Sequence, residues 1–189
     1  MAKVSIENIR KQFGSAVAVS DFSLEIAEGE LVTFLGPSGC GKTTTLRTIM
    51  GLWRASQGLV TFDGTPIGGP GTRKSPPDMA RMGMAYVPEN MGIFADLSVK
   101  ENILLAARQA RSADQLDTAR LEWIFGFFPA LKKFWLHPAG KLSGGQKKLL
   151  ELGRLLMLEP RCILLDEPFA GVNPVLIEEL WRGSCRACM

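Results

Sequence analysis

The sequence predicts an α/β core that is interrupted by a helical insertion. Short continuous apolar runs at residues 31–35 and 162–165 are typical of strands buried on both faces of a mostly parallel sheet. From about residue 98 to residue 158 strand patterns vanish, and apolar residues recur at helical spacing instead. Because a strand pattern returns at residue 162, we expect one core with a helical part inserted into it.

The composition is that of an ordinary globular protein. Of the 189 residues, 46% are apolar and 22% are charged, so a sizeable core can form. The net charge of +3 gives no independent case for nucleic acid or an anionic membrane as a partner. Residues 1–10 carry no signal-peptide pattern, and no apolar run approaches the roughly 20 residues that span a bilayer. We expect a soluble or peripheral protein, with any membrane part supplied by another chain.

The lysines and cysteines have simple interpretations. A basic stretch is expected to form a solvated face, with the members Lys132, Lys133, Lys141, Lys147 and Lys148. Cys40 and Cys162 lie in motifs where a disulfide would not fit, which favours free thiols in a reducing compartment. Cys185 and Cys188 form one CxxC pair. With His137 as the lone histidine, a zinc site lacks ligands, so we interpret the pair as an unpaired tail.

Strand patterns dominate the first 90 residues. Near-alternation of apolar residues supports the second strand, Gly14 and Gly64 lie in turns, and Pro88 stops the last strand. The predicted strands are residues 4–9, 17–26, 31–35, 59–62 and 83–87, with a Gly-rich turn at 36–41, a helix at 42–52 and a Gly- and Pro-rich loop at 68–78.

Helices are predicted for most of the second half. Residues 101–110 and 116–128 have amphipathic patterns. Ser143 can cap a further helix that runs to residue 158. The apolar run at 162–165 then returns the chain to the core.

A Gly-rich loop after the third strand matches the phosphate-binding pattern GxxxxGK[ST] in full. The loop comprises Gly36, Pro37, Ser38, Gly39, Cys40, Gly41, Lys42 and Thr43. Consecutive backbone N–H groups can wrap phosphate oxygens because glycine allows the close approach, and the following helix directs its positive dipole end at them. The Lys42 ammonium suits the β- and γ-phosphates, and the Thr43 hydroxyl suits Mg²⁺. The strand before the loop and the helix after it favour this interpretation over a chance Gly-rich turn.

The apolar run at 162–165 ends in two carboxylates. Asp166 suits direct or indirect Mg²⁺ binding, and Glu167 suits orienting and deprotonating an attacking water. Taken alone, an acidic pair at a strand end is more simply a pair without chemistry. The phosphate loop decides for the catalytic interpretation.

Residues 142–146, Leu-Ser-Gly-Gly-Gln, form a second candidate anion-binding site. A Gly-Gly pair that follows Ser143 at a helix start offers backbone N–H groups and the helix dipole. A single nucleoside triphosphate does not need two such sites. Two make sense if the site of one chain closes on the γ-phosphate held by another. This predicts two cassettes that face each other head to tail with ATP between them.

With this pentapeptide placed between the phosphate loop and the acidic strand, the chain resembles the ABC ATPase family over about residues 3–181. The resemblance implies a P-loop NTPase, RecA-like core formed by residues 1–92 and 160–189. It implies a helical subdomain that carries the signature and is formed by residues 93–159.

The resemblance also implies a set of nucleotide contacts. Phe13 falls where the family stacks an aromatic ring on adenine, although a lone Phe before a Gly is more often part of a core. Thr44 joins the phosphate loop as a cofactor-binding residue. On the partner's side of the nucleotide, the expected contacts are Ser143, Gly144, Gly145 and Gln146.

Glu89 falls where most of the family has Gln. The resemblance implies that it senses the γ-phosphate and Mg²⁺, as a catalytic and metal-binding residue, and couples to the membrane domain. Residues 48–52, 86–89 and 128–131 resemble the branch that serves branched-chain amino-acid uptake, and residues 170–174 match the wider branched-chain set. Residues 90–92 depart from the Gly-Arg-Arg usual in that branch, which leaves the solute open, urea and short amides included.

The family places a histidine at the end of the strand that follows the acidic one. Here residues 174–181 have a helical pattern, and residues 183–189 have no strand pattern. We therefore expect a truncated or frame-shifted chain with the final strands missing. Such a chain should bind ATP and hydrolyse it poorly, because losing one charge-stabilising contact costs roughly 10²–10³ in rate. Exposed sheet edge would also favour aggregation.

The resemblance thus implies an Mg²⁺-dependent ATPase subunit that drives inward transport of a small solute, with branched-chain amino acids foremost. The implied partners are membrane permease subunits, a second ATP-binding subunit of the same or another kind, and indirectly a solute-binding protein, but no nucleic acid. The implied location is the cytoplasmic face of the inner membrane. The alternatives are a nucleotide-binding fragment with little turnover, a soluble ABC ATPase acting on DNA or the ribosome, and a P-loop kinase. Soluble ABC ATPases usually carry a long coiled-coil insertion or two fused cassettes, and these 189 residues contain neither. A P-loop kinase would lack residues 142–146 and would need a pocket for an acceptor substrate.

Overall fold

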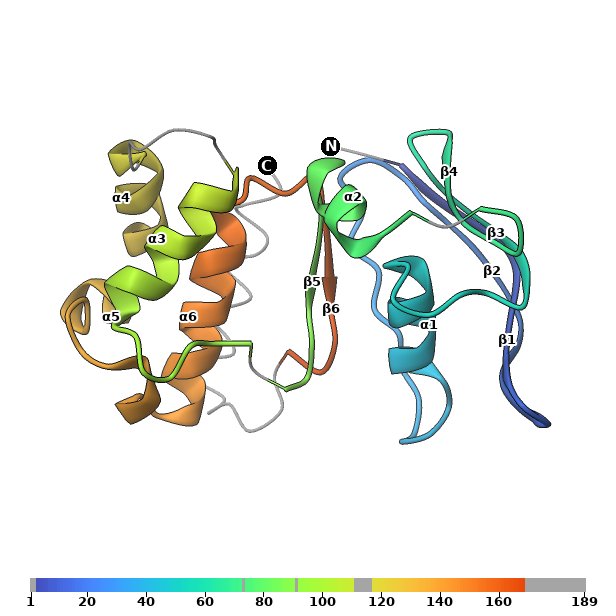
Figure 1. Ribbon diagram of the computed structural model, residues 1–189, viewed down its shortest axis with the longest axis horizontal. Coiled ribbons are helices and arrows are strands. Elements are labelled where there is room, and N and C mark those ends of the chain that lie inside the picture. Colours follow the sequence, from blue (N-terminus) through green and yellow to red (C-terminus); the bar gives the residue numbers. More distant parts are fainter. Residues whose placement is uncertain (1–2, 73, 91, 111–116, 169–189) are drawn as a thin grey trace. The chain divides into compact units, whose positions relative to one another are not determined.

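The computed structural model describes residues 3–72, 74–90, 92–110 and 117–168, and the chain divides into two compact units (Figure 1). The first unit comprises Met1–Tyr86 and Arg161–Asp166, and the second comprises Val87–Pro160 and Glu167–Met189. The helix expected at residues 174–181 and the tail with its CxxC pair lie outside the described residues.

Most of the first unit is an antiparallel sheet with the strand order β2-β1-β3-β4. Its strands are β1 (Val4–Phe13), β2 (Ala16–Ile26), β3 (Gln57–Phe62) and β4 (Thr65–Gly68). The strands predicted at 4–9, 17–26 and 59–62 are therefore confirmed. Gly58 lies so close to β1 that a Cβ there would come within 2.4 Å of the carbonyl oxygens of Glu7 and Asn8. A side chain at this position would push β3 away from β1.

A second, two-stranded sheet pairs β5 (Met84–Val87) with β6 (Cys162–Leu165). Both strands were predicted from their short apolar runs, and both are confirmed. The carbonyl oxygen of Gly83 accepts hydrogen bonds from the backbone N–H groups of Arg161 (2.7 Å) and Cys162 (3.1 Å). β6 brings Asp166, at its carboxyl end, into the first unit.

Helices α1 (Lys42–Ile49) and α2 (Pro76–Arg81) complete the first unit. The predicted helix at 42–52 is too long, because Gly51 leaves the helical conformation with a φ of 71°. α2 begins inside the predicted loop at 68–78. Ser75 caps it by accepting from the Asp78 N–H while Asp78 accepts from the Ser75 N–H. The sequence Ser-Pro-Pro-Asp carried that signal, since Pro is favoured in the first turn.

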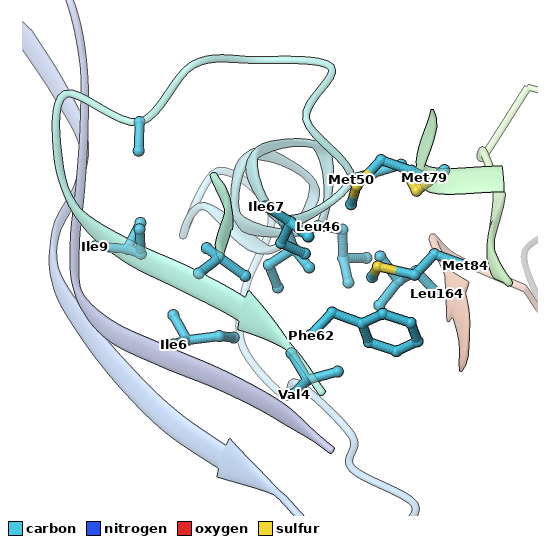
Figure 2. Packing of buried hydrophobic residues seen from close by; sticks show 13 residues of the cluster. Val4, Ile6, Ile9, Leu46, Met50, Phe62, Ile67, Met79, Met84 and Leu164 are labelled. Atoms are coloured by element: carbon cyan, nitrogen blue, oxygen red, sulfur yellow. The ribbon is translucent and has the colours of Figure 1, made fainter. Parts of the chain in front are cut away.

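The core of the first unit joins α1 to both sheets (Figure 2). Leu46 lies near Ile67, Met50 lies near Met79, and Met84 and Leu164 from the small sheet lie beside the Phe62 ring. Met79 of α2 is fully buried in the same cluster. Apolar burial therefore holds α1, which begins at the phosphate loop, and β6, which ends at Asp166, against one core.

The strand predicted at residues 31–35 is wrong. In the described residues this segment has no strand structure, and it does not pair with a neighbouring strand. Leu31 is 61% exposed and Leu35 is 90% exposed. An apolar run predicts a buried strand only where the backbone finds partners on both sides, and no described segment supplies them.

The second unit is helical. Its elements are α3 (Val99–Ala110), α4 (Thr118–Phe127), α5 (Pro129–Lys133), a 3₁₀ turn at Ala139–Lys141 and α6 (Gly144–Leu156). The three helices predicted in this region are confirmed to within a few residues at each end. α3 and α6 run side by side (Figure 1), and α5 also contacts α6. The Arg120 guanidinium of α4 donates two hydrogen bonds, of 3.1 and 2.9 Å, to the Leu156 carbonyl at the end of α6. No helix in the described ranges has the length and apolarity needed to cross a bilayer.

Lys148 does not belong to a solvated basic face, and this expectation is wrong. The residue is only 2% exposed, and its ammonium lies 3.2 Å from the Glu151 carboxylate. The error has a physical cause: residues 148 and 151 are one helical turn apart, so an opposite charge was available to a buried lysine. Lys132 does conform to the expectation, with 60% of its side chain exposed and Glu122 as its surface partner.

Candidate nucleotide-binding site

The phosphate loop leads directly into α1 in the first unit. Gly41 occupies the position that precedes the helix, with a φ of 96°. A Cβ at Gly41 would lie 2.7 Å from the carbonyl oxygen of Ala18 in β2, so glycine is required both for conformation and for space. Gly39 also has a positive φ, of 83°. The backbone of the loop thus adopts a form that only these glycines accommodate.

Lys42 folds back over its own loop. Its ammonium donates to the carbonyl oxygens of Gly36 (2.6 Å) and Pro37 (3.0 Å), and it lies 3.7 Å from the Cys40 Sγ. These bonds hold a full positive charge beside the first turn of α1, where the helix dipole adds its own positive end. The arrangement favours an anion with several oxygens.

Asp166 is a buried carboxylate with both oxygens hydrogen-bonded. It is 2% exposed. The Thr43 hydroxyl donates to its Oδ1 at 2.8 Å, and the Tyr86 hydroxyl donates to its Oδ2 at 2.9 Å. Two predicted metal ligands, Thr43 and Asp166, are therefore in direct contact although they are far apart in the sequence.

Tyr86 and Arg47 extend this network, and sequence reasoning missed both roles. The Arg47 Nε donates to the Tyr86 hydroxyl at 3.4 Å. Burial raises the pKa of Tyr86 above its usual value; the Arg47 hydrogen bond opposes this, and Asp166 reinforces it. The hydroxyl therefore keeps its proton and remains a donor to Asp166. A Tyr in the strand next to the acidic one was the available signal, because neighbouring strand ends meet at one edge.

The donor set fits Mg²⁺. Thr43 and Asp166 present a hydroxyl oxygen and a carboxylate oxygen, the hard ligands that this ion prefers. Mg²⁺ in nucleotide sites is typically held by one or two protein oxygens together with substrate phosphates rather than by a full protein cage. No group of three or more His, Cys, Asp or Glu side chains suited to a metal occurs in the described part of the chain.

Phe13 lies at the end of β1, and the structure does not bury it. The side chain is 44% exposed. The Trp53 ring meets it edge-on with centroids 5.1 Å apart, and the Lys11 ammonium lies 4.4 Å from its centroid. An exposed ring with one aromatic neighbour can offer a face for stacking. Trp53 was not anticipated.

In the second unit, residues 142–146 form the start of α6. Ser143 is the cap, and its hydroxyl oxygen accepts from the Gln146 N–H at 3.3 Å. The Gln146 Oε1 in turn accepts from the Ser143 N–H at 2.9 Å. The Gln146 side chain is therefore engaged in capping. Ser143 and Gly144 are exposed at the start of a helix of 13 residues.

Glu89 and Glu167 also belong to the second unit. Both are exposed. The Glu89 carbonyl oxygen accepts from the Lys148 ammonium at 3.4 Å, which anchors its backbone to α6. Glu167 has a φ of 48°, a left-handed conformation that is uncommon for a residue with a side chain and recurs at functional sites.

The α/β fold and the site formed by the Gly-rich loop, Thr43 and Asp166 are those of a nucleotide-binding cassette. Comparison with known proteins agrees with this class. A family model described as "ABC transporter" matches residues 19–170. The chain therefore belongs to the ABC transporter family, whose ATP-binding domains are ATPases.

Two curated relatives illustrate the breadth of this similarity. The "High-affinity branched-chain amino acid transport ATP-binding protein BraG" of Pseudomonas aeruginosa is 32% identical over 179 residues, which cover 95% of this chain and 74% of BraG. The "Sulfate/thiosulfate import ATP-binding protein CysA 1" of Chromobacterium violaceum is 35% identical over 192 residues, which cover 95% of this chain and 49% of that protein. The chain thus spans about half the length of the CysA-type relatives.

Solved structures share the fold. A nucleotide-free ATP-binding cassette from an ABC transporter has a TM-score of 0.82 at 28% identity, covering 100% of this chain and 78% of its own. The ADP conformation of an ATP-binding cassette has a TM-score of 0.78 at 30% identity, covering 100% of this chain and 77% of its own. The predicted α/β, P-loop NTPase fold is confirmed.

Proposed function

We propose that this chain is the ATP-binding and ATP-hydrolysing subunit of an ABC importer. The observation that carries the proposal is the contact of Thr43 with the buried Asp166, beside a loop that holds the Lys42 ammonium. A cation-binding oxygen pair next to a fixed positive charge is what a magnesium–nucleotide complex requires.

Each residue of the phosphate loop has a proposed task. The backbone of residues 36–41 wraps the phosphates, with Thr44 among the contacts, and Lys42 neutralises the β- and γ-phosphate oxygens. Thr43 and Asp166 would hold Mg²⁺, which neutralises charge that develops on the transferred phosphoryl group. Phe13 offers its exposed ring to the adenine.

Hydrolysis needs a water held in line with the γ-phosphate. Glu167 orients this water and accepts its proton, and Glu89 responds to the γ-phosphate and Mg²⁺. Ser143, Gly144 and Gly145 contact the γ-phosphate bound by a second cassette, so ATP joins two subunits. The capped start of α6 supports this role, because its N-terminal N–H groups and dipole favour an anion.

The proposed partners are two membrane permease subunits, a second cassette and, indirectly, a solute-binding protein. The cassette acts as a peripheral subunit at the cytoplasmic face of the inner membrane. Its core is formed by residues 1–92 and 160–189, and the subdomain by residues 93–159 carries the signature.

Branched-chain amino acids are the proposed solute. BraG supports this choice because the alignment with it covers most of both chains. Residues 86–89 and 128–131 also resemble that branch. Sulfate or thiosulfate is a second candidate, favoured by the 35% identity to CysA 1. Uptake of labelled leucine and of labelled sulfate by vesicles that contain the chain and its neighbouring permeases would separate the two.

The direct test of the motor role is the variant Lys42→Ala. We expect its affinity for ATP to fall about tenfold to a hundredfold, because a charge-assisted interaction of roughly 1.5–3 kcal/mol is lost. Lys132→Ala, which removes a surface lysine, is the matched control and should leave ATP affinity unchanged. Calorimetric titration with MgATP measures ATP binding, and phosphate release measures ATP hydrolysis. Equal affinity in Lys42→Ala and wild type would sink the proposal, and ATP binding without turnover would favour a nucleotide-binding chain with no motor activity.

A further inference from the structure

Three charged residues on one side of α6 hold the segment that follows β5. Lys148, Glu151 and Arg154 are spaced three residues apart, so they lie along neighbouring turns of the helix. All three belong to the second unit, as do residues 88–90 and 92–94, several of which they contact. We call these three residues the α6 clamp.

The clamp grips backbone groups. The Lys148 ammonium donates to the carbonyl oxygens of Pro88 (3.2 Å) and Glu89 (3.4 Å). The Glu151 Oε1 accepts from the Gly92 N–H at 3.0 Å, while its Oε2 lies 3.2 Å from Lys148. The Arg154 guanidinium donates to the Gly92 carbonyl oxygen. The buried Lys148–Glu151 ion pair therefore fixes the backbone of Glu89.

Two further contacts fix the far end of the segment. Arg154 stacks over the Phe94 ring, with its guanidinium carbon 5.0 Å from the centroid. The Asn102 side chain, fully buried in α3, accepts from the Phe94 N–H and donates to the Phe94 carbonyl oxygen, both at 2.9 Å. The segment is thus tied at both ends, while the Glu89 side chain itself stays exposed.

Because the ion pair is buried, it is expected to add little to the free energy of unfolding. Lys148 is 2% exposed and Glu151 is 7% exposed. Desolvating two charges offsets most of their attraction, and apolar residues of similar size are often as stable or more so. What an apolar pair cannot do is bind the carbonyl oxygens of residues 88 and 89 and the N–H of residue 92. The pair therefore contributes position rather than net stability.

We propose that Lys148 and Glu151 are positioning residues for Glu89, holding its backbone to the helix that Ser143 caps. The inference rests on the proposed function of Glu89 as the residue that responds to the γ-phosphate and Mg²⁺. With the clamp formed, the backbone at residues 88, 89 and 92 is tied to α6. Without it, the carbonyl oxygens of residues 88 and 89 form hydrogen bonds to water instead. The backbone that carries the Glu89 side chain is then no longer held in one position.

The test replaces the pair by apolar residues in the double variant Lys148→Met/Glu151→Leu. Because neither member of the buried pair is left without the other, we expect this variant to fold and to unfold at a urea concentration close to that of wild type. Amide hydrogen exchange at Gly92 should accelerate about tenfold or more, because a hydrogen bond to a charged acceptor is lost. Lys147→Met, one residue away on the same helix, is the matched control and should leave exchange at Gly92 unchanged.

The functional arm combines the double variant with Glu89→Ala. We expect each to raise the Mg²⁺ concentration that gives half-maximal ATP binding, and the combined variant to match Glu89→Ala alone. That lack of additivity shows that the pair acts through Glu89, which a purely structural role would not produce. Additive effects, or an unchanged Mg²⁺ response in the double variant, would overturn the proposal.

MgATP binding by wild type separates a failure of the proposed function from a failure of the positioning role. If wild type does not bind MgATP, the proposed function fails and the positioning role fails with it. If wild type binds MgATP through Lys42 but exchange at Gly92 is unchanged in the double variant, only the positioning role is overturned.

Discussion

Among the described residues, each unit contains one buried carboxylate, and the two are stabilised in different ways. Asp166 in the first unit is 2% exposed and accepts hydrogen bonds from two neutral hydroxyls, those of Thr43 and Tyr86. Glu151 in the second unit is 7% exposed and pairs with the Lys148 ammonium. One buried charge is solvated by dipoles, and the other is cancelled by a cation.

The difference separates two kinds of task. Neutral hydroxyl donors stabilise the Asp166 carboxylate without neutralising its charge. On the proposed function, that charge is available to a divalent cation. The Glu151 charge is neutralised by Lys148 inside the helical unit, where the pair binds the backbone at residues 88, 89 and 92. On the proposed function, the partners of Asp166 suit a cation ligand, whereas those of Glu151 suit a structural clamp.

The largest effect is expected from breaking the clamp on one side only. Lys148→Met leaves the Glu151 carboxylate buried without its cation, which typically costs about 3–5 kcal/mol. Urea denaturation of this variant measures the loss of unfolding free energy. Lys147→Met should change it by less than about 0.5 kcal/mol. Equal values for the two variants would mean that the ion pair does not form.

A smaller effect is expected from Tyr86→Phe, which removes one donor to Asp166. We expect a loss of about 1 kcal/mol in unfolding free energy at pH 7, the usual net value of one hydrogen bond. Because burial raises the pKa of Tyr86 in the folded state, its contribution is present below pH ~10 and is lost as pH rises through the folded pKa. The gap between wild type and Tyr86→Phe should therefore narrow in alkaline urea titrations. A gap that does not depend on pH would contradict the hydrogen bond to Asp166.

The comparison between the units also explains how much the sequence could predict. The phosphate loop, the acidic strand and the start of α6 follow from local patterns, because glycines, a cap and an apolar run act within a few residues. The Thr43–Asp166 contact was foreseeable as a pair of metal ligands. Tyr86 and Lys148 were not, because their roles depend on which distant strand or loop packs against them. The strand prediction for residues 31–35 was wrong for the same reason, because an apolar run does not show whether its backbone finds hydrogen-bond partners.

The smallest effect concerns a capping carboxylate, a charge exposed to solvent. Hydrogen bonds from the Ser98 hydroxyl and backbone N–H hold the pKa of Glu101 below its usual value. This contribution to stability is present above the ordinary pKa of about 4.3 and is lost as pH falls through the folded pKa. In Ser98→Ala the pKa of Glu101 should rise part of the way back, as followed by NMR titration. The pKa of Asp78, held low in the same way by Ser75, is the internal control and should not move.

The most direct test of the account is the Mg²⁺ dependence of ATP binding in wild type and in Asp166→Asn. The amide keeps the size of the side chain and removes the charge that the neutral donors leave available. We expect Mg²⁺ to strengthen ATP binding to wild type by at least about tenfold, or 1.4 kcal/mol, and to have little effect on Asp166→Asn. Folding should be nearly unchanged, which circular dichroism can verify. An equal Mg²⁺ effect in the two proteins would contradict the assignment of Asp166 as the carboxylate reserved for the cation.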